Sequence, residues 1–298
     1  MTCDPPWRII CASRVAVQGD AMNLRHIAAF SDGDVGGNPA GVWLGDALPD
    51  ELTMQRIAAE VGFSETAFAV PMKHAWRVRY FSPESEVPFC GHATIALGAA
   101  LVLDHGDGMY ALALNDAHIT VEGHRNGERI VAALQSPHTH SKTTDPKLVA
   151  EVLALFGYAP DDLDPRIPPA MACAGATHLV LALDTRAKLA AMRYSLDAGR
   201  TLMQHAGLTT IALVYAETPM LFHARNAFAS GGVYEDPATG AGAAALAGYL
   251  RDIRWPQRDV IYIVQGEDMG SRSRLRAEFS RVTGSSIRVS GTARMMEV

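Results

Sequence analysis

The stretch GHATIALGAAL, residues 91–101, indicates the fold more directly than any other part of the sequence. It aligns without gaps with GAGAAALAGYL, residues 240–250, about half a chain length further on. Each stretch reads as a helix of small residues that begins with glycine, just after a short turn containing proline. A duplicated domain would produce this similarity, with one such helix in each half.

Glycine within these two helices lowers helix propensity by roughly 1 kcal/mol per residue relative to alanine. Close contact with surrounding backbone can offset that cost, because a glycine or alanine allows other elements to approach the helix axis. We therefore expect each helix to be a buried central element that is wrapped by strands.

The rest of the chain contains more strand-like than helix-like segments. Further helices are expected at 50–61, between Asp50 and Gly62, and after Asp145–Pro146 up to Gly157. The segment 31–41, SDGDVGGNPAG, reads as a loop whose glycines need unusual backbone angles. The expected strands are 24–30, 67–71, 76–81, 110–114, 118–123, 129–134, 178–184, 210–217, 221–228, 260–266 and 275–280. Strands that come in runs favour the α+β class over a doubly wound sheet.

The composition limits the classes of function. A chain of 298 residues with 48% hydrophobic and 19% charged residues can form one large or two ordinary domains. Its net charge of −6 argues against nucleic-acid and membrane-surface partners, and no run of 18 apolar residues predicts a membrane span.

The four cysteines predict neither a disulfide framework nor a metal site. Cys3, Cys11, Cys90 and Cys173 form no CxxC pair and lie at no metal-finger spacing from a histidine. A reducing, cytoplasmic location is expected. Residues 1–21 differ in character from the rest of the chain and are expected to be a poorly ordered N-terminal extension.

The starts of the two small-residue helices are candidate binding sites for a carboxylate. Gly91-His92 and Gly240-Ala241 would offer free N–H groups and the positive end of a helix dipole. If the two halves face each other, both ends point into one cleft. The alternative is that the ends are capped, with Thr239 and Asp236 serving the second helix.

Three titratable residues lie near these ends. Glu65 lies between apolar residues in FSETAF, where partial desolvation would raise its pKa toward the range of a general base, but a capping role is also possible. His92 is a candidate for orienting or sharing a proton, or a structural residue at a helix start. Asp236 in EDPATG is a candidate for binding a substrate amine, for capping the helix, or for both.

Cys90 is a further candidate, because a thiol at a helix start can have a lowered pKa. The matching place in the second half holds Pro237, so a mechanism with two thiols is excluded. A small, buried apolar role is favoured for Cys90. The chain also lacks the P-loop, GxSxG, HExxH and strand-linked GxGxxG patterns.

Several motifs in order resemble one known family: GNPAGVWL (37–44), IAAEVGFSETAFAV (57–70), VRYFSPESEVPFCGHAT (78–94), EDPATGAGAAALAGYL (235–250) and QGEDMGSRS (265–273). They are similar to the PhzF-like proteins, relatives of the phenazine-biosynthesis isomerase within the diaminopimelate epimerase fold. The resemblance covers nearly the whole chain from about residue 24. It implies two α+β domains related by pseudo-twofold symmetry, each a curled, mostly antiparallel sheet around a central helix.

The resemblance also implies where these domains and their site lie. The expected halves are 22–138 with 285–298, and 139–284, with the active site between them. The family's catalytic glutamate, histidine and aspartate correspond to Glu65, His92 and Asp236. The substrate-binding residues are expected to be Asn38, Gly91, Thr239, Gly240 and Ala241. Family members commonly form homodimers and need neither metal nor organic cofactor.

The motif departs from the family at Ala241, where a serine is usual, so the resemblance does not by itself assign the phenazine-pathway substrate. The expected function is cofactor-independent isomerisation of a small carboxylated metabolite through proton transfer by Glu65. The alternatives are a metabolite-binding protein without catalysis, and a lyase that uses the same base.

Overall fold

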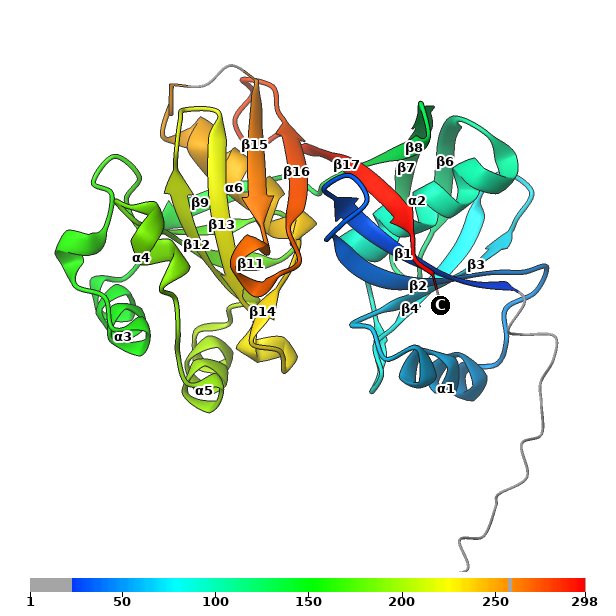
Figure 1. The fold of residues 1–298 in the computed structure, drawn as a ribbon, viewed down its shortest axis with the longest axis horizontal. Helices are drawn as coiled ribbons and strands as arrows, with labels where there is room; N and C mark the ends of the chain where they lie inside the picture. The colour runs from blue at the N-terminus through cyan, green and yellow to red at the C-terminus, as the bar shows by residue number, and fades with distance from the viewer. Residues whose placement is uncertain (1–22, 257–258, 298) are drawn as a thin grey trace, which may run out of the picture.

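Two lobes lie side by side in the computed structural model, which describes residues 23–256 and 259–297 (Figure 1). Each lobe consists of strands curled around one helix, α2 (Gly91–His105) in the first lobe and α6 (Gly240–Asp252) in the second. This arrangement confirms the expected α+β fold with two related domains. The exact boundaries of the two halves and the nature of residues 1–21 stay predictions, and the latter lie outside the described residues.

The first lobe contains the strands up to β8 together with β17, and the second contains β9 to β16. The strands are β1 (Leu24–Ser31), β2 (Asn38–Leu44), β3 (Thr66–Pro71), β4 (Trp76–Phe81), β5 (Glu86–Val87), β6 (Gly108–Ala113), β7 (His118–Asn126), β8 (Arg129–Gln135), β9 (His140–Thr143), β10 (Ala170–Cys173), β11 (Thr177–Ala182), β12 (Thr210–Ala216), β13 (Leu221–Ala227), β14 (Glu235–Asp236), β15 (Val260–Gln265), β16 (Ser273–Glu278) and β17 (Arg288–Met295). Most neighbouring strands run antiparallel, and the pairing is continuous from one lobe to the other through β1, β16 and β17.

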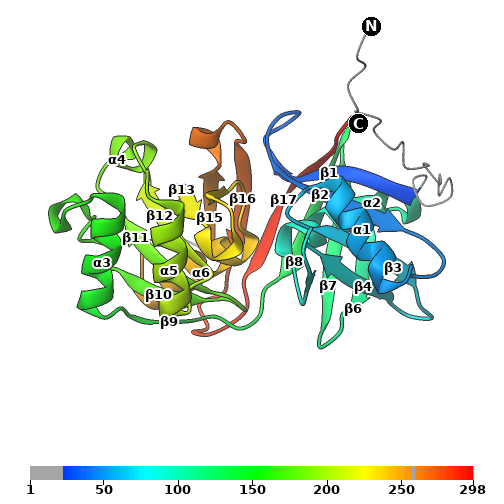
Figure 2. The same cartoon turned by 90° about the horizontal axis from the view of Figure 1, so that it is seen from below.

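Within the described part of the chain, four further α-helices lie on the outside of the lobes (Figure 2). They are α1 (Glu51–Val61), α3 (Pro146–Phe156), α4 (Arg186–Ala190) and α5 (Leu196–Ala206). Met54 and Ile57 of α1 pack against Phe68 and Phe81. Helices α3, α4 and α5 cover the outer face of β11 to β13 through a second apolar cluster. The predicted caps of α1 are confirmed, since Asp50 accepts a hydrogen bond from the N–H of Thr53 and Gly62 ends the helix in the left-handed conformation.

Close packing accounts for the small residues of the central helices. All residues from His92 to Val102 are buried, as are nearly all residues of α6. A side chain at Gly98 would come within 2.6 Å of Val121 Cγ2, and one at Gly248 within 2.7 Å of Thr139 Cβ. Strands therefore approach both helix axes as the sequence predicted, and this contact offsets the low helix propensity of glycine.

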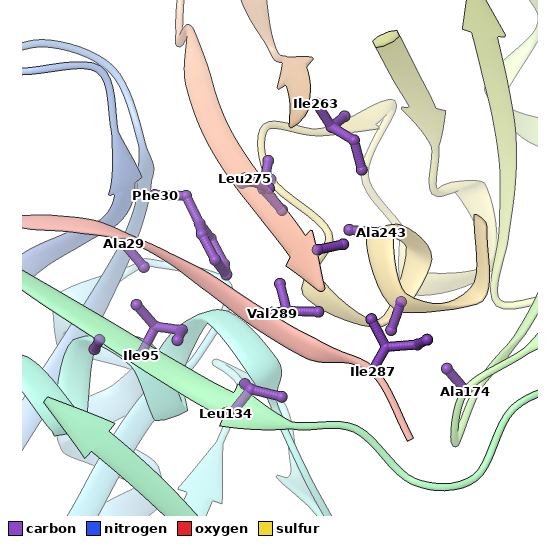
Figure 3. Packing of buried hydrophobic residues seen from close by; sticks show 14 of the residues in the cluster. Ala29, Phe30, Ile95, Leu134, Ala174, Ala243, Ile263, Leu275, Ile287 and Val289 are labelled. Atoms are coloured by element: carbon purple, nitrogen blue, oxygen red, sulfur yellow. The ribbon is translucent and has the colours of Figure 1, made fainter. Parts of the chain in front are cut away.

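One core joins the two lobes. Buried residues from α2, such as Ile95, and from α6, such as Ala243, belong to the same apolar cluster, and Phe30 and Val289 lie between them (Figure 3). Phe30 has a φ of 60° where the pairing of β1 with β17 shifts register. Its ring lies close to Gly240, at the start of α6. The core thus fixes where this helix start lies relative to the first lobe.

The segment predicted as a loop at 31–41 is a loop only between residues 32 and 37, because Ser31 still belongs to β1. Strand β2 begins at Asn38, where β1 pairs with it on one side and β3 on the other, so the prediction was wrong for residue 31 and for residues 38–41. The glycines of the true loop have the expected positive φ values, including 62° at Gly36 and 87° at Gly37. The loop contacts the other lobe, where the N–H of Gly37 donates to the carbonyl oxygen of Arg272 over 3.2 Å.

Among the described residues, no helix combines the length and the apolar character that crossing a membrane requires. Cys90 and Cys173, the cysteines in the described part of the chain, are both free thiols.

Candidate active site

A cavity of about 450 Å³ lies between the lobes. Its lining includes every site residue predicted from the sequence: Asn38, Glu65, Gly91, His92, Asp236, Thr239, Gly240 and Ala241. They come from distant segments of the chain, including the end of the α1–β3 turn and the starts of β2, α2 and α6. A cavity of this size suits a small metabolite.

Both central helices begin at this cavity, and neither is capped by a side chain. Cys90 precedes α2 and Thr239 precedes α6, and neither side chain bonds to its helix. The first intrahelical bonds are donated by the N–H groups of Thr94 and Ala243, which leaves the preceding N–H groups without intrahelical partners. The two ends face each other, because a side chain at Gly91 would lie 3.9 Å from the Ala241 nitrogen. Capping by Thr239 or Asp236, the alternative considered for α6, is wrong.

The positive ends of the two helix dipoles also lack any acidic partner within their own first turns. Free N–H groups and two converging dipoles make this end of the cavity favourable for an anion such as a carboxylate.

Glu65, His92 and Cys90 form a line of contacts along one wall. The Nε2 atom of His92 lies 3.3 Å from Glu65 Oε2 and 3.3 Å from Ser64 Oγ. Its Nδ1 atom lies 3.3 Å from Cys90 Sγ. The Glu65 side chain is 16% exposed, so its carboxylate is largely removed from solvent but still reaches the cavity.

The thiol of Cys90 is therefore more than an apolar filler, since it contacts the His92 ring. Burial and the nearby Glu65 carboxylate raise the pKa of Cys90 well above its ordinary value, despite its position at a helix start. The thiol is neutral at neutral pH and is a poor proton acceptor. The sequence had excluded a mechanism with two thiols, and the raised pKa also makes Cys90 unsuited to act as a base on its own.

Asp236 is held in place from both lobes. Asn38 Nδ2 donates to Asp236 Oδ1 over 2.7 Å, and Thr239 Oγ1 donates to Oδ2 over 2.5 Å. Gln265, which the sequence analysis did not single out, accepts from the Thr239 N–H and donates to the Asp236 carbonyl oxygen. Burial raises the pKa of Asp236, and the His92 ring opposes that shift. A carboxylate in this setting is suited to bind a donor group of a ligand.

A second groove of about 730 Å³ adjoins the cavity. The two share Phe63, Ser64, Glu65, Phe228 and Val233, so Glu65 lies where the outer groove meets the inner cavity. The outer groove provides a route by which a ligand can reach the Glu65 carboxylate from solvent.

The spacing of Glu65, Cys90 and His92 would also suit a metal ion. One possible ligand atom from each lies within 4.8 Å of the other two. The buried, neutral thiol does not favour binding, because a thiol ligates metal as the thiolate.

The cavity contains residues that the sequence analysis missed, among them His178, Thr210 and Phe228. His178 opens the apolar stretch HLVLALD, and a histidine at the start of a buried strand was the available signal. Its meaning depends on Thr210, 32 residues later, which the strand pairing brings alongside.

The comparisons with known proteins show a family match over most of the chain. The family model described as phenazine biosynthesis-like protein matches residues 27–297. An uncharacterized isomerase of Mesorhizobium japonicum is 30% identical over 286 residues, which cover 89% of this chain and 93% of that protein. An uncharacterized isomerase of Pseudomonas aeruginosa is 30% identical over 247 residues, covering 80% of this chain and 82% of its own.

Solved structures support the fold. A phenazine biosynthesis protein of the PhzF family from Bacillus anthracis superposes with a TM-score of 0.82 at 22% identity, covering 92% of this chain and 96% of the other. A probable proline racemase from Agrobacterium radiobacter has a TM-score of 0.62 at 12% identity, with 92% of each chain covered. The match over most of the length shows that the chain belongs to the phenazine biosynthesis-like family and is an isomerase of that family.

Proposed function

We propose that the chain is a cofactor-independent isomerase in which Glu65 moves a proton on a small carboxylated metabolite bound between the lobes. One observation carries the proposal: Glu65, His92 and two uncapped helix starts converge on a single cavity of about 450 Å³. An anion site beside a carboxylate base is what proton abstraction next to a carboxylate requires.

In this proposal the substrate carboxylate binds at the starts of α2 and α6. The N–H groups of Gly91-His92 and Gly240-Ala241 donate to its oxygens, and the two helix dipoles stabilise its charge. The usual serine of the family is absent at Ala241, so the backbone supplies the donors at that position. Negative charge that spreads onto the carboxylate when a neighbouring carbon loses its proton is stabilised by the same groups.

Glu65 then acts as the base and as the acid. Its carboxylate takes a proton from a substrate carbon, and the resulting carboxyl group returns a proton to another carbon or to the other face of the same carbon. No atoms are gained or lost, so the product is an isomer. His92, 3.3 Å from Glu65, positions the carboxyl group, while Asp236 and Asn38 position the substrate from the other side.

Burial supports this chemistry because it strengthens electrostatic interactions. The Glu65 side chain is 16% exposed and the His92 side chain 7% exposed. A weak carboxylate base becomes more effective when bound substrate replaces the remaining water.

The test is incubation of the protein in D₂O with a panel of small carboxylic acids, followed by mass spectrometry. The proposal predicts a carboxylic acid that gains deuterium at carbon, and a product equal in mass to the substrate apart from that deuterium. Loss of water or ammonia from the product would identify a lyase instead. Tight binding without any exchange at carbon would contradict the proposed proton transfer.

We further propose that the protein works as a homodimer in a reducing, cytoplasmic setting. The free thiols of Cys90 and Cys173 support the reducing environment. Sedimentation at equilibrium measures the assembly. A mass of about twice 31.9 kDa is expected, and a mass of 31.9 kDa at all concentrations would contradict the dimer.

A further inference from the structure

A fully buried histidine in the cavity wall has an unused hydrogen-bonding atom. His178 lies in β11, is 0% exposed, and is one of the residues that line the cavity. Its Nδ1 atom contacts Thr210 Oγ1 over 2.7 Å, but its Nε2 atom has no hydrogen-bond partner in the described chain. Among the buried side-chain atoms without a partner there, this one alone belongs to a residue of the cavity.

The contacts of His178 determine which nitrogen carries the proton. Thr210 Oγ1 donates its one hydrogen to Asn226 Oδ1 over 3.2 Å. The hydroxyl oxygen must then accept from the histidine, so the proton lies on Nδ1 and the lone pair on Nε2. Burial lowers the pKa of His178 to about 4, so the ring is neutral at neutral pH.

The three side chains form a row across strands β11, β12 and β13 of the second lobe. His178 pairs with Thr210, and Asn226 pairs with Asp236 on β14. His178 and Thr210 line the cavity, and Asn226 connects them to Asp236, whose carboxylate Asn38 and Thr239 hold. An unpaired, buried acceptor is unfavourable in a folded protein, and one that belongs to a cavity wall can be paired by a ligand bound in that cavity.

We infer that His178 accepts, through Nε2, a hydrogen bond from an ammonium or hydroxyl group of the substrate. This inference rests on the proposed function, since it assigns a partner to the substrate of the same cavity. It narrows the substrate class to carboxylic acids that also carry an N–H or O–H donor. His178 would select among acids, whereas Glu65 would act on carbon.

The first measurement is ¹⁵N NMR of the histidine rings in the ligand-free protein, assigned with the His178→Gln variant. The expected spectrum has a neutral His178 ring protonated on Nδ1 and unprotonated on Nε2. A proton on Nε2 would overturn the inference, whatever the substrate proves to be.

The second measurement is calorimetric binding to the Glu65→Gln variant, in which turnover is expected to be slow. Two matched series serve as probes: butanoate with its 2-hydroxy and 2-amino derivatives, and succinate with malate and aspartate. The acids with a donor should bind more tightly than butanoate or succinate, by about tenfold for one added hydrogen bond. Donor-bearing acids that bind no more tightly than butanoate and succinate in both series would overturn the inference.

Two variants in the same Glu65→Gln background separate binding from structural support. His178→Phe should abolish the preference for donors and leave butanoate and succinate unchanged, while His178→Gln, which keeps an acceptor oxygen, should retain most of it. Equal weakening of all acids by His178→Phe, with the fold intact by thermal unfolding, assigns a structural role and overturns the inference. These outcomes are independent of the proposed proton transfer, which is tested by exchange at carbon and not by these affinities.

Discussion

One residue of the site, Asp236, lowers the stability of the folded protein at neutral pH. Its carboxylate accepts hydrogen bonds from Asn38 and Thr239, yet burial still raises its pKa above 3.8. A carboxyl group whose pKa is higher in the folded state favours folding at low pH, and this contribution is lost as the pH rises through the folded-state pKa. At neutral pH the ionised group therefore destabilises the fold.

Replacing Asp236 with asparagine should consequently stabilise the protein at pH 7, on the order of 1 kcal/mol, while weakening ligand binding. The gain in free energy of unfolding over wild type should vanish below pH 3.8. It should appear as the pH rises through the folded-state pKa of Asp236. Urea unfolding across pH measures it. Asp116→Asn, at an exposed turn position, is the control and should show no such rise. A destabilised Asp236→Asn variant at pH 7 would contradict this account.

At the residue scale, most of the site residues could be predicted from the sequence, but not all of them. Glu65, His92 and Asp236 lie in short motifs that can be read locally, and all three line the cavity. The absence of capping by Thr239 could not be foreseen, because its hydroxyl is taken by Asp236 and Gln265. The significance of His178 likewise arises from strand pairing with Thr210.

The central helices are the elements that the sequence predicted best. Their glycines and alanines are explained by strands that approach within contact distance, as at Gly98 and Val121. Helix α5 and strand β17 were not predicted. The alternation of β17 is weak, and its pairing with β1, β8 and β16 stabilises the strand. Helix α5 has Gly199 in its interior, which packs against Tyr194.

The packing at Gly98 gives a prediction for α2. Helix propensity alone would make Gly98→Ala stabilising by roughly 1 kcal/mol. The new methyl group would lie 2.6 Å from Val121 Cγ2, so a loss of about 1–3 kcal/mol in the free energy of unfolding is expected instead. Urea unfolding measures it, with the Gly98→Ala/Val121→Ala double variant as control.

The double variant should lose less free energy of unfolding than the Gly98→Ala and Val121→Ala single variants lose together. Alanine at position 121 makes room for the new methyl group. Stabilisation by Gly98→Ala alone would show that strand β7 does not restrict the helix.

At the scale of the whole molecule, the chain passes between the lobes twice, from β8 to β9 and from β16 to β17. The crossings lie next to each other, since the N–H of Ser136 donates to the Ile287 carbonyl oxygen over 2.8 Å. The Asn38–Asp236 bond also spans the lobes. The sequence predicted two related halves from the repeated helix, and the family resemblance placed the crossings near residues 138 and 285. It could not show that the crossings bond to each other, because the bonded residues are 151 positions apart.

The whole molecule should act without a metal ion. Dialysis against EDTA should leave the rate of deuterium exchange at carbon unchanged, because the proposed steps use only protein groups. Glu65, Cys90 and His92 have the spacing of a metal site, so the result is informative. Activity that EDTA removes and zinc restores would contradict the cofactor-independent mechanism.

The most direct test of the central claim is the rate of solvent-deuterium incorporation at carbon in the Glu65→Gln protein. Glu60→Gln is the matched control, since Glu60 is an exposed residue of α1 that pairs with Arg56. The account predicts a loss of about 10²–10⁴-fold for Glu65→Gln and no change for Glu60→Gln. Exchange at close to the wild-type rate in a folded Glu65→Gln protein would contradict it.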